Sequence, residues 1–146
     1  MRKTAERTIA PLGRGFTLIE VMVVVVILGI LATLVTPRIL DRIEQARQMT
    51  ARAQIRVIAN EIQMFRMDTG RYPESLQNLV SDPGLPGWQE GGYLEHGRVP
   101  QDPWGRDYVY IRPGRDGREF DLFSYGRDGE RGGSGYDAEI RHWELD

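Results

Sequence analysis

Apolar residues are distributed very unevenly along this chain. Residues 16–35 are almost wholly apolar, and Glu20 is the one charged residue among them. A transmembrane helix needs about 20 apolar residues, which is the length of this run. The pattern predicts a membrane-spanning helix over residues 16–36. Its first turns carry a carboxylate that a membrane interior disfavours unless the charge is paired.

A different apolar pattern follows over residues 37–69. Ile55, Ile58, Ile62 and Phe65 recur at helical spacing, and charged residues fill much of the remaining surface. This pattern predicts an amphipathic helix that ends near Gly70, a residue suited to a helix C-terminus. A second apolar stripe lies beside the first and consists of Ile39, Ile43, Ala46, Thr50, Ala53 and Val57.

From residue 70 onward the chain reads as loops and short strands. Tyr72-Pro73-Glu74 indicates a short helix that continues to about Val80, with Pro73 in its first turn. Residues 107–112 and 119–123 alternate in polarity around the turn PGRDG, which predicts an antiparallel hairpin, and residues 140–143 add a short third strand. The expected fold class is α+β: a long N-terminal helix packed on a small antiparallel sheet, with residues 37–146 as the folded domain and residues 70–146 as its loops and sheet.

Composition and charge narrow the classes of function. The chain has 146 residues, no cysteine and a formal net charge of -2. It cannot form a disulfide, and it shows no basic patch with interleaved aromatic residues that would indicate a nucleic-acid partner. No catalytic arrangement of Ser, His and Asp is recognisable. His96 and His142 are expected to be surface or packing residues, and we expect no enzymatic activity.

The first fifteen residues are basic. Four basic residues precede the apolar run, against the single acid Glu6. By the positive-inside rule, this charge places residues 1–15 in the cytoplasm and residues 37–146 across the membrane.

The junction between these regions resembles that of a known family. Gly15-Phe16-Thr17-Leu18-Ile19-Glu20 resembles the processing site of type IV pilin-like proteins. The resemblance implies that a prepilin peptidase and methyltransferase cleaves between Gly15 and Phe16, removes the leader 1–15 and N-methylates Phe16. It also implies that Glu20 acts in subunit assembly. There its carboxylate would pair with the Phe16 amine of a neighbouring subunit, an attraction that is strong in a low dielectric.

The rest of the chain narrows the resemblance. Tyr72-Pro73, Asp102-Pro103-Trp104-Gly105 and the segment FSYGRDGERGGSGYDAEIRHW resemble the major pseudopilins, or G subunits, of type II secretion systems. Two departures are Tyr125, where Leu is common, and Glu139, where Asp often precedes the Ile.

That resemblance implies a self-polymerising subunit of a periplasmic pseudopilus that drives export of folded proteins across the outer membrane. The subunit would begin as a single-pass protein of the inner membrane. Its implied partners are minor pseudopilins and an inner-membrane assembly platform. The alternative is a subunit of an adhesive or DNA-uptake filament, or an anchored receptor.

Residues 125–140 form a glycine-rich acidic stretch. Calcium takes 6–8 oxygen ligands, which carboxylates and backbone carbonyls of such a loop can supply. By spacing alone, a solvated acidic loop is favoured, since GGSGYD matches only part of one calcium-binding nonapeptide. The pseudopilin resemblance instead implies a calcium ion at this loop. Its implied ligands are the side chains of Asp128 and Asp137 and the carbonyls of Tyr125, Arg127 and Glu130, with Glu139 as a weaker candidate.

Overall fold

The computed structural model describes residues 15–145, and only the backbone of residues 34–38. The predicted leader falls on residues 1–14, which lie outside the described residues, and on Gly15. The chain divides between Ile39 and Leu40 into two units, which we describe separately.

Helix α1 (Leu18–Thr69) supplies the helical part of both units. Thr17 caps its first turn, because the Thr17 Oγ1 atom accepts a hydrogen bond from the Glu20 N–H at 3.3 Å. The helix continues through Pro37 and ends at Thr69, followed by Gly70 with a φ of 76°. This end agrees with the prediction, since a residue with positive φ is a common helix terminator.

The first unit presents an uncovered apolar surface. Every large apolar side chain that the structure describes from Phe16 to Leu31 exposes half or more of its area, and Phe16 exposes 83%. Within the described residues, no helix combines the length and the hydropathy of a membrane span.

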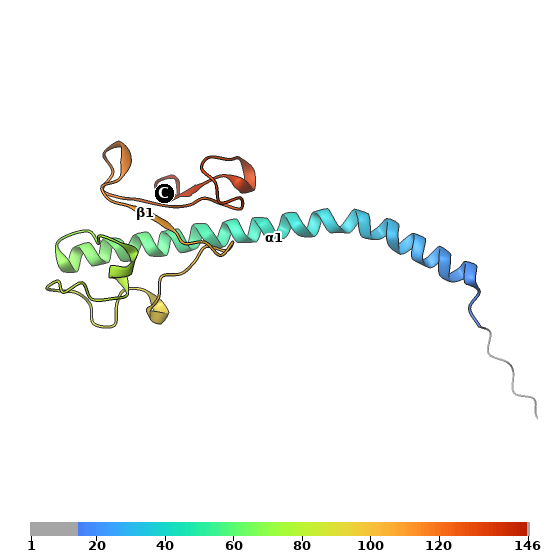
Figure 1. Ribbon diagram of the computed structural model, residues 1–146, viewed down its shortest axis with the longest axis horizontal. Helices are drawn as coiled ribbons and strands as arrows, with labels where there is room; N and C mark the ends of the chain where they lie inside the picture. Colours follow the sequence, from blue (N-terminus) through green and yellow to red (C-terminus); the bar gives the residue numbers. More distant parts are fainter. Residues whose placement is uncertain (1–14, 146) are drawn as a thin grey trace, which may run out of the picture. The chain divides into compact units, whose positions relative to one another are not determined.

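The second unit contains a three-stranded antiparallel sheet in the order β1-β2-β3. Val109 in β1 (Val109–Ile111) is paired with Phe123 in β2 (Asp121–Ser124), and Ser124 is paired with Ile140 in β3 (Ile140–Arg141). The predicted hairpin and third strand are confirmed, as is the α+β fold class. Figure 1 shows the strands, coloured orange to red, alongside the C-terminal half of α1.

One hydrophobic core holds this unit together. It joins one face of α1 to the segment after the helix and to the inner face of the sheet. Its buried members are Ala51, Ile55, Ile58, Ile62, Phe65, Tyr72, Leu76, Leu79, Tyr93, Leu94, Tyr108, Phe120, Leu122 and Ile140.

The two apolar stripes of the amphipathic helix differ in burial. Ile55, Ile58, Ile62 and Phe65 are buried in the core, whereas Ile43 and Val57 of the other stripe remain exposed. Periodicity marked both stripes as apolar, but the sheet and loops cover only one of them.

The predicted helix over residues 73–80 is wrong in type and extent. The structure has a 3-10 turn, η1 (Leu76–Leu79), which begins after Ser75. The Asn78 side chain accepts hydrogen bonds from the N–H groups of Glu74 and Ser75 at 3.0 and 3.1 Å. These bonds fix the chain before η1 in a turn, and Pro73 lies ahead of it rather than inside it. The remaining 3-10 turns are η2 (Glu95–Gly97), η3 (Arg115–Gly117), η4 (Gly135–Asp137) and η5 (His142–Glu144).

Candidate functional site: the assembly segment and the C-terminal loop

The predicted assembly residues lie at the start of α1. Gly15, Phe16 and Thr17 precede the helix, and Glu20 is exposed in its first turn. A carboxylate in this position is favourable within one chain, because the N-terminal end of a helix carries partial positive charge. Glu20 therefore has a local stabilising role. Its pairing with the Phe16 amine of another subunit stays a prediction.

The predicted calcium ligands all lie in the loop between β2 and β3. Asp128 folds back on its own turn, where its Oδ1 atom accepts a hydrogen bond from the Glu130 N–H at 3.0 Å. Asp137 accepts two hydrogen bonds from the Arg127 guanidinium, at 2.8 and 3.0 Å. The Arg127 hydrogen bonds lower the pKa of Asp137.

Glu139, the weaker candidate, is also engaged. Its carboxylate accepts hydrogen bonds from the Gly132 N–H at 3.0 Å and from the Arg141 Nε at 2.9 Å. Burial alone would raise the pKa of Glu139, but these two donors lower it. The side chain therefore holds the loop to the start of β3.

The Arg106 side chain also contacts this loop, and the sequence pattern did not predict that contact. Its guanidinium donates to the carbonyls of Gly126 and Arg127 at 2.9 and 3.1 Å. The Arg127 carbonyl, a predicted calcium ligand, receives a second bond from the same guanidinium at 3.1 Å. No local pattern points to this contact, which joins residues about 20 positions apart.

A turn over residues 102–106 fixes the position of Arg106. Asp102 is buried, and its Oδ1 atom accepts hydrogen bonds from the N–H groups of Trp104 and Arg106 at 3.1 and 2.9 Å. Its Oδ2 atom accepts a hydrogen bond from the Ser124 hydroxyl at 2.7 Å. The Asp-Pro-Trp-Gly string signals such a turn, but it does not reveal that Ser124 at the end of β2 is the partner.

The loop is also attached to α1. The Gln48 side chain donates to the Gly135 carbonyl at 2.8 Å, and the Tyr136 hydroxyl donates to the Asp41 carbonyl at 3.3 Å. The loop is thus held from the helix side as well as from the sheet side.

These contacts bear on whether the loop suits a calcium ion. Calcium needs 6–8 oxygens that are free to turn toward it. Here Asp137 and the Arg127 carbonyl already accept charge-assisted hydrogen bonds. The described residues also contain no group of three or more acidic or histidine side chains that could hold a metal ion. In this arrangement the residues do not fit calcium, and calcium binding stays a prediction to be tested.

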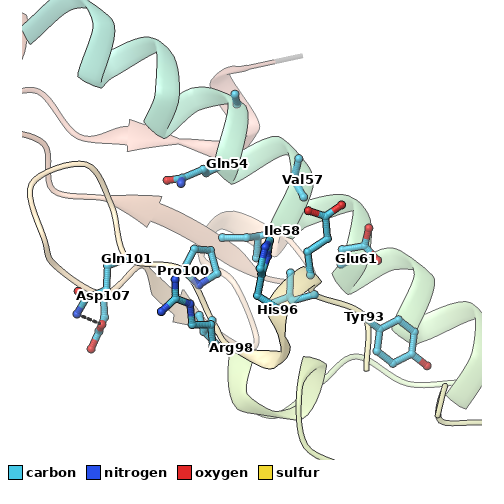
Figure 2. A pocket seen from close by; sticks show the side chains of 14 residues that line it. Gln54, Val57, Ile58, Glu61, Tyr93, His96, Arg98, Pro100, Gln101 and Asp107 are labelled. Atoms are coloured by element: carbon cyan, nitrogen blue, oxygen red, sulfur yellow. Dashed lines mark hydrogen bonds between the residues drawn. The ribbon is translucent and has the colours of Figure 1, made fainter. Parts of the chain in front are cut away.

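A hollow lies elsewhere, between α1 and the segment from Tyr93 to Asp107. It is an open groove of about 780 Å³. Figure 2 shows Val57, Ile58 and Glu61 of α1 on one side and His96 and Pro100 on the other. Burial raises the pKa of the Glu61 carboxyl. The groove presents a mixed apolar and charged surface.

The two histidines occupy the places predicted for them. His96 is exposed on η2, with a φ of 64°. His142 stacks on Phe120, with ring centroids 4.6 Å apart, and its Nδ1 accepts a hydrogen bond from the Leu122 N–H at 3.1 Å. His142 therefore packs against the sheet.

Two known family descriptions match this chain, each over a different segment. Residues 38–143 match the family described as "Type II secretion system (T2SS), protein G". Residues 13–36 match the "Prokaryotic N-terminal methylation motif".

Individual proteins give consistent matches. The chain is 45% identical over 137 residues to the "Type II secretion system core protein G" of Pseudomonas aeruginosa, covering 89% of this chain and 94% of the relative. Identity to the protein of the same name from Vibrio cholerae is also 45% over 137 residues, covering 90% of this chain and 92% of the relative. The crystal structure of the major pseudopilin from the type 2 secretion system of enterohaemorrhagic Escherichia coli superposes with a TM-score of 0.56 at 31% identity. That match covers 70% of this chain and 91% of the solved one.

Proposed function

This chain belongs to the type II secretion system protein G family, and we propose that it polymerises into the pseudopilus of such a system. It is the major pseudopilin, a structural subunit rather than an enzyme. Growth of the filament in the periplasm would drive folded proteins across the outer membrane. The proposal assigns the chain a mechanical role, which depends on how subunits are held in the filament.

The observation that carries the proposal is the uncovered apolar surface at the start of α1. Large apolar side chains from Phe16 to Leu31 expose half or more of their area. So large an apolar surface needs a partner, either lipid or other protein. A subunit of a membrane-derived filament would meet both partners in turn. The segment would rest in lipid before assembly and pack against copies of itself afterwards.

We place the subunit in the inner membrane before assembly. Residues 16–35 have the length and composition of a membrane anchor, and this run includes Leu34 and Val35, whose side chains are not described. The basic residues 1–15 would hold the N-terminus in the cytoplasm, with the folded unit in the periplasm.

Processing would release the subunit for assembly. In this proposal a prepilin peptidase cleaves between Gly15 and Phe16 and methylates the new N-terminus. The match of residues 13–36 to the N-terminal methylation motif supports this step. The assembly platform of the inner membrane and minor pseudopilins would then act on the mature subunit.

Glu20 would set the register between subunits. Its carboxylate is exposed in a single chain and has room to meet a positive group from outside. The Phe16 amine of the next subunit is such a group, and the pair would be strong once both are removed from water. Apolar side chains alone specify axial register poorly, so this pair would supply the specificity.

The alternative, an adhesive or DNA-uptake filament, has less support. The family match and the relatives named above are proteins of secretion systems. The two functions also predict different phenotypes, which makes the proposal testable in the native host.

The test is deletion of the gene followed by complementation. We expect the deletion strain to retain folded exoproteins in the periplasm, and the wild-type gene to restore their secretion. A Gly15→Lys variant should fail to restore it and should keep its leader, as intact mass would show. Normal secretion by the deletion strain, with loss of adhesion or DNA uptake instead, would overturn the proposal.

A further inference from the structure

Two arginine side chains bracket the loop between β2 and β3. Arg106 donates three hydrogen bonds to the carbonyls of Gly126 and Arg127, at distances of 2.9 to 3.1 Å. Its guanidinium also lies against Gly129, where a Cβ atom would overlap it. The guanidinium therefore fills the inside of the turn formed by residues 126–129.

The backbone of Arg106 is itself fixed by a hydrogen bond to a buried side chain. The buried Asp102 carboxylate accepts a hydrogen bond from the Arg106 N–H at 2.9 Å and another from the Ser124 hydroxyl at 2.7 Å. Ser124 Oγ in turn accepts the Gly126 N–H at 3.1 Å. The turn that carries Arg106 and the first residues of the loop thus form one hydrogen-bonded unit, and little side-chain freedom remains to be lost.

Arg127 closes the other side of the loop. Its guanidinium binds the Asp137 carboxylate through two parallel hydrogen bonds, a geometry that only arginine offers. Its backbone N–H donates to the Tyr136 carbonyl at 3.1 Å. The pair spans the loop from its start to η4 and keeps its two ends together.

Two of the groups that these arginines bind are among the predicted ligands of a divalent cation. A calcium ion at the predicted ligands would draw the Arg127 carbonyl and the Asp137 carboxylate toward a common centre. Both groups instead accept hydrogen bonds from guanidinium groups. The two guanidinium groups also neutralise part of the negative charge that would attract a cation to the loop.

We propose that Arg106 and Arg127 close the loop of residues 125–140 in place of a divalent cation, so that the folded unit keeps its stability without calcium. Arg106 gathers the backbone carbonyls at the start of the loop, and Arg127 supplies the counter-charge to Asp137. The rival hypothesis is the calcium ion predicted from family resemblance. The two make opposite predictions for the same measurement.

The measurement is thermal unfolding of the full-length chain in detergent, followed by tryptophan fluorescence. The three tryptophans, Trp88, Trp104 and Trp143, all lie after Leu40 and therefore report on the folded unit. We expect the wild-type melting temperature to be the same in millimolar calcium chloride and in excess chelator. A rise in calcium would overturn the proposal and support the calcium hypothesis.

A pair of variants tests the role of Arg106 directly. Arg106→Gln should lower the melting temperature by roughly 5 °C or more, in calcium and in chelator alike, because several charge-assisted bonds are lost. Arg131→Gln is the matched control, since Arg131 is an exposed arginine of the same loop that acts on Glu139 through its charge, as the last of several causes that lower the Glu139 pKa. It should melt like the wild type. Equal melting of the Arg106→Gln variant and the wild type would also overturn the proposal. If that variant does not fold, the wild-type comparison still decides between the hypotheses.

Discussion

Glu20 has two physical explanations, and substitutions can separate them. Within one chain, its charge favours the N-terminal end of α1, while Thr17 Oγ1 caps the Glu20 N–H at 3.3 Å. Between chains, its carboxylate would neutralise the Phe16 amine of a neighbour. Only the second role requires a charge that reaches another subunit.

We expect Glu20→Gln and Glu20→Leu to insert into the membrane normally and to lose assembly. Chemical crosslinking of intact cells measures assembly as a ladder of multimers. Thr17→Ala is the control for capping alone. It should cost about 1 kcal/mol at the helix start and leave the ladder intact. A normal ladder from Glu20→Gln would contradict the pairing and leave the local role as the explanation.

Asp121 is a buried carboxylate that depends on two arginines. It is fully buried, and its two oxygens accept hydrogen bonds from the Nε atoms of Arg115 and Arg118, each at 2.7 Å. Burial alone would raise its pKa, but the arginine hydrogen bonds lower the pKa from 3.8 to about 2. A carboxyl whose pKa is lower in the folded state adds stability above its unfolded pKa.

Asp121 should therefore add about 2 kcal/mol of stability at neutral pH, and this should be lost as the pH falls from about 4 toward 2. Urea unfolding at several pH values measures it. Asp121→Asn should destabilise the chain at pH 7 by about 2 kcal/mol, because the charge-assisted hydrogen bonds from the partly exposed Arg115 and Arg118 lose their carboxylate acceptor. The variant should also make the free energy of unfolding less dependent on pH in this range. Asp116→Asn is the control, since the Asp116 side chain is 84% exposed, and it should change the free energy of unfolding little.

At the level of elements, the turn around Gly87, which follows η1, packs against the C-terminal end of α1. Gly87 has a φ of 84°, and a Cβ atom there would overlap the backbone carbonyl of Asp68 in the last turn of the helix. Gly84 has a similar φ of 77°, but a Cβ atom there would meet no atom within 4 Å. The two glycines share the same backbone strain for an L-residue and differ in this contact.

Gly84→Ala should cost about 1 kcal/mol, from its left-handed backbone alone. Gly87→Ala should cost about 1–2 kcal/mol more, because the turn must move away from the helix. Melting temperatures measured by tryptophan fluorescence give the difference. Equal destabilisation by the two changes would show that the turn yields without cost.

At the level of the whole molecule, the uncovered stripe of α1 requires a partner. Ile43 exposes 43% and Val57 54% of their area, although both lie on a helix whose other apolar stripe is fully buried. Exposed apolar residues are common singly, but a stripe at helical spacing is typical of a contact surface. In a filament of identical subunits, the neighbouring chains would cover it.

We expect Ile43→Asp to leave the melting temperature unchanged and to reduce the crosslinked ladder. The stability should hold because the side chain makes no part of the core. Gln45→Asp introduces the same charge at an exposed polar position two residues away and should assemble normally. A full ladder from Ile43→Asp would place the stripe outside the subunit contacts.

The sequence by itself determined the parts of this protein that depend on local order. The apolar run, the helix end at Gly70 and the hairpin around PGRDG follow from periodicity and turn chemistry, which act over a few residues. The strings around Gly15 and Asp102 likewise carried the family resemblance. These features needed no knowledge of how distant segments meet.

The tertiary structure decided which of the marked groups face one another. Periodicity marks two apolar stripes on α1, and folding of residues 70–146 against one of them made it the core. Arg106 reads as one more charged residue in the sequence, and it closes the C-terminal loop only because a buried turn places it against the carbonyls of Gly126 and Arg127. Such contacts join residues far apart in the chain, where neither spacing nor propensity carries information.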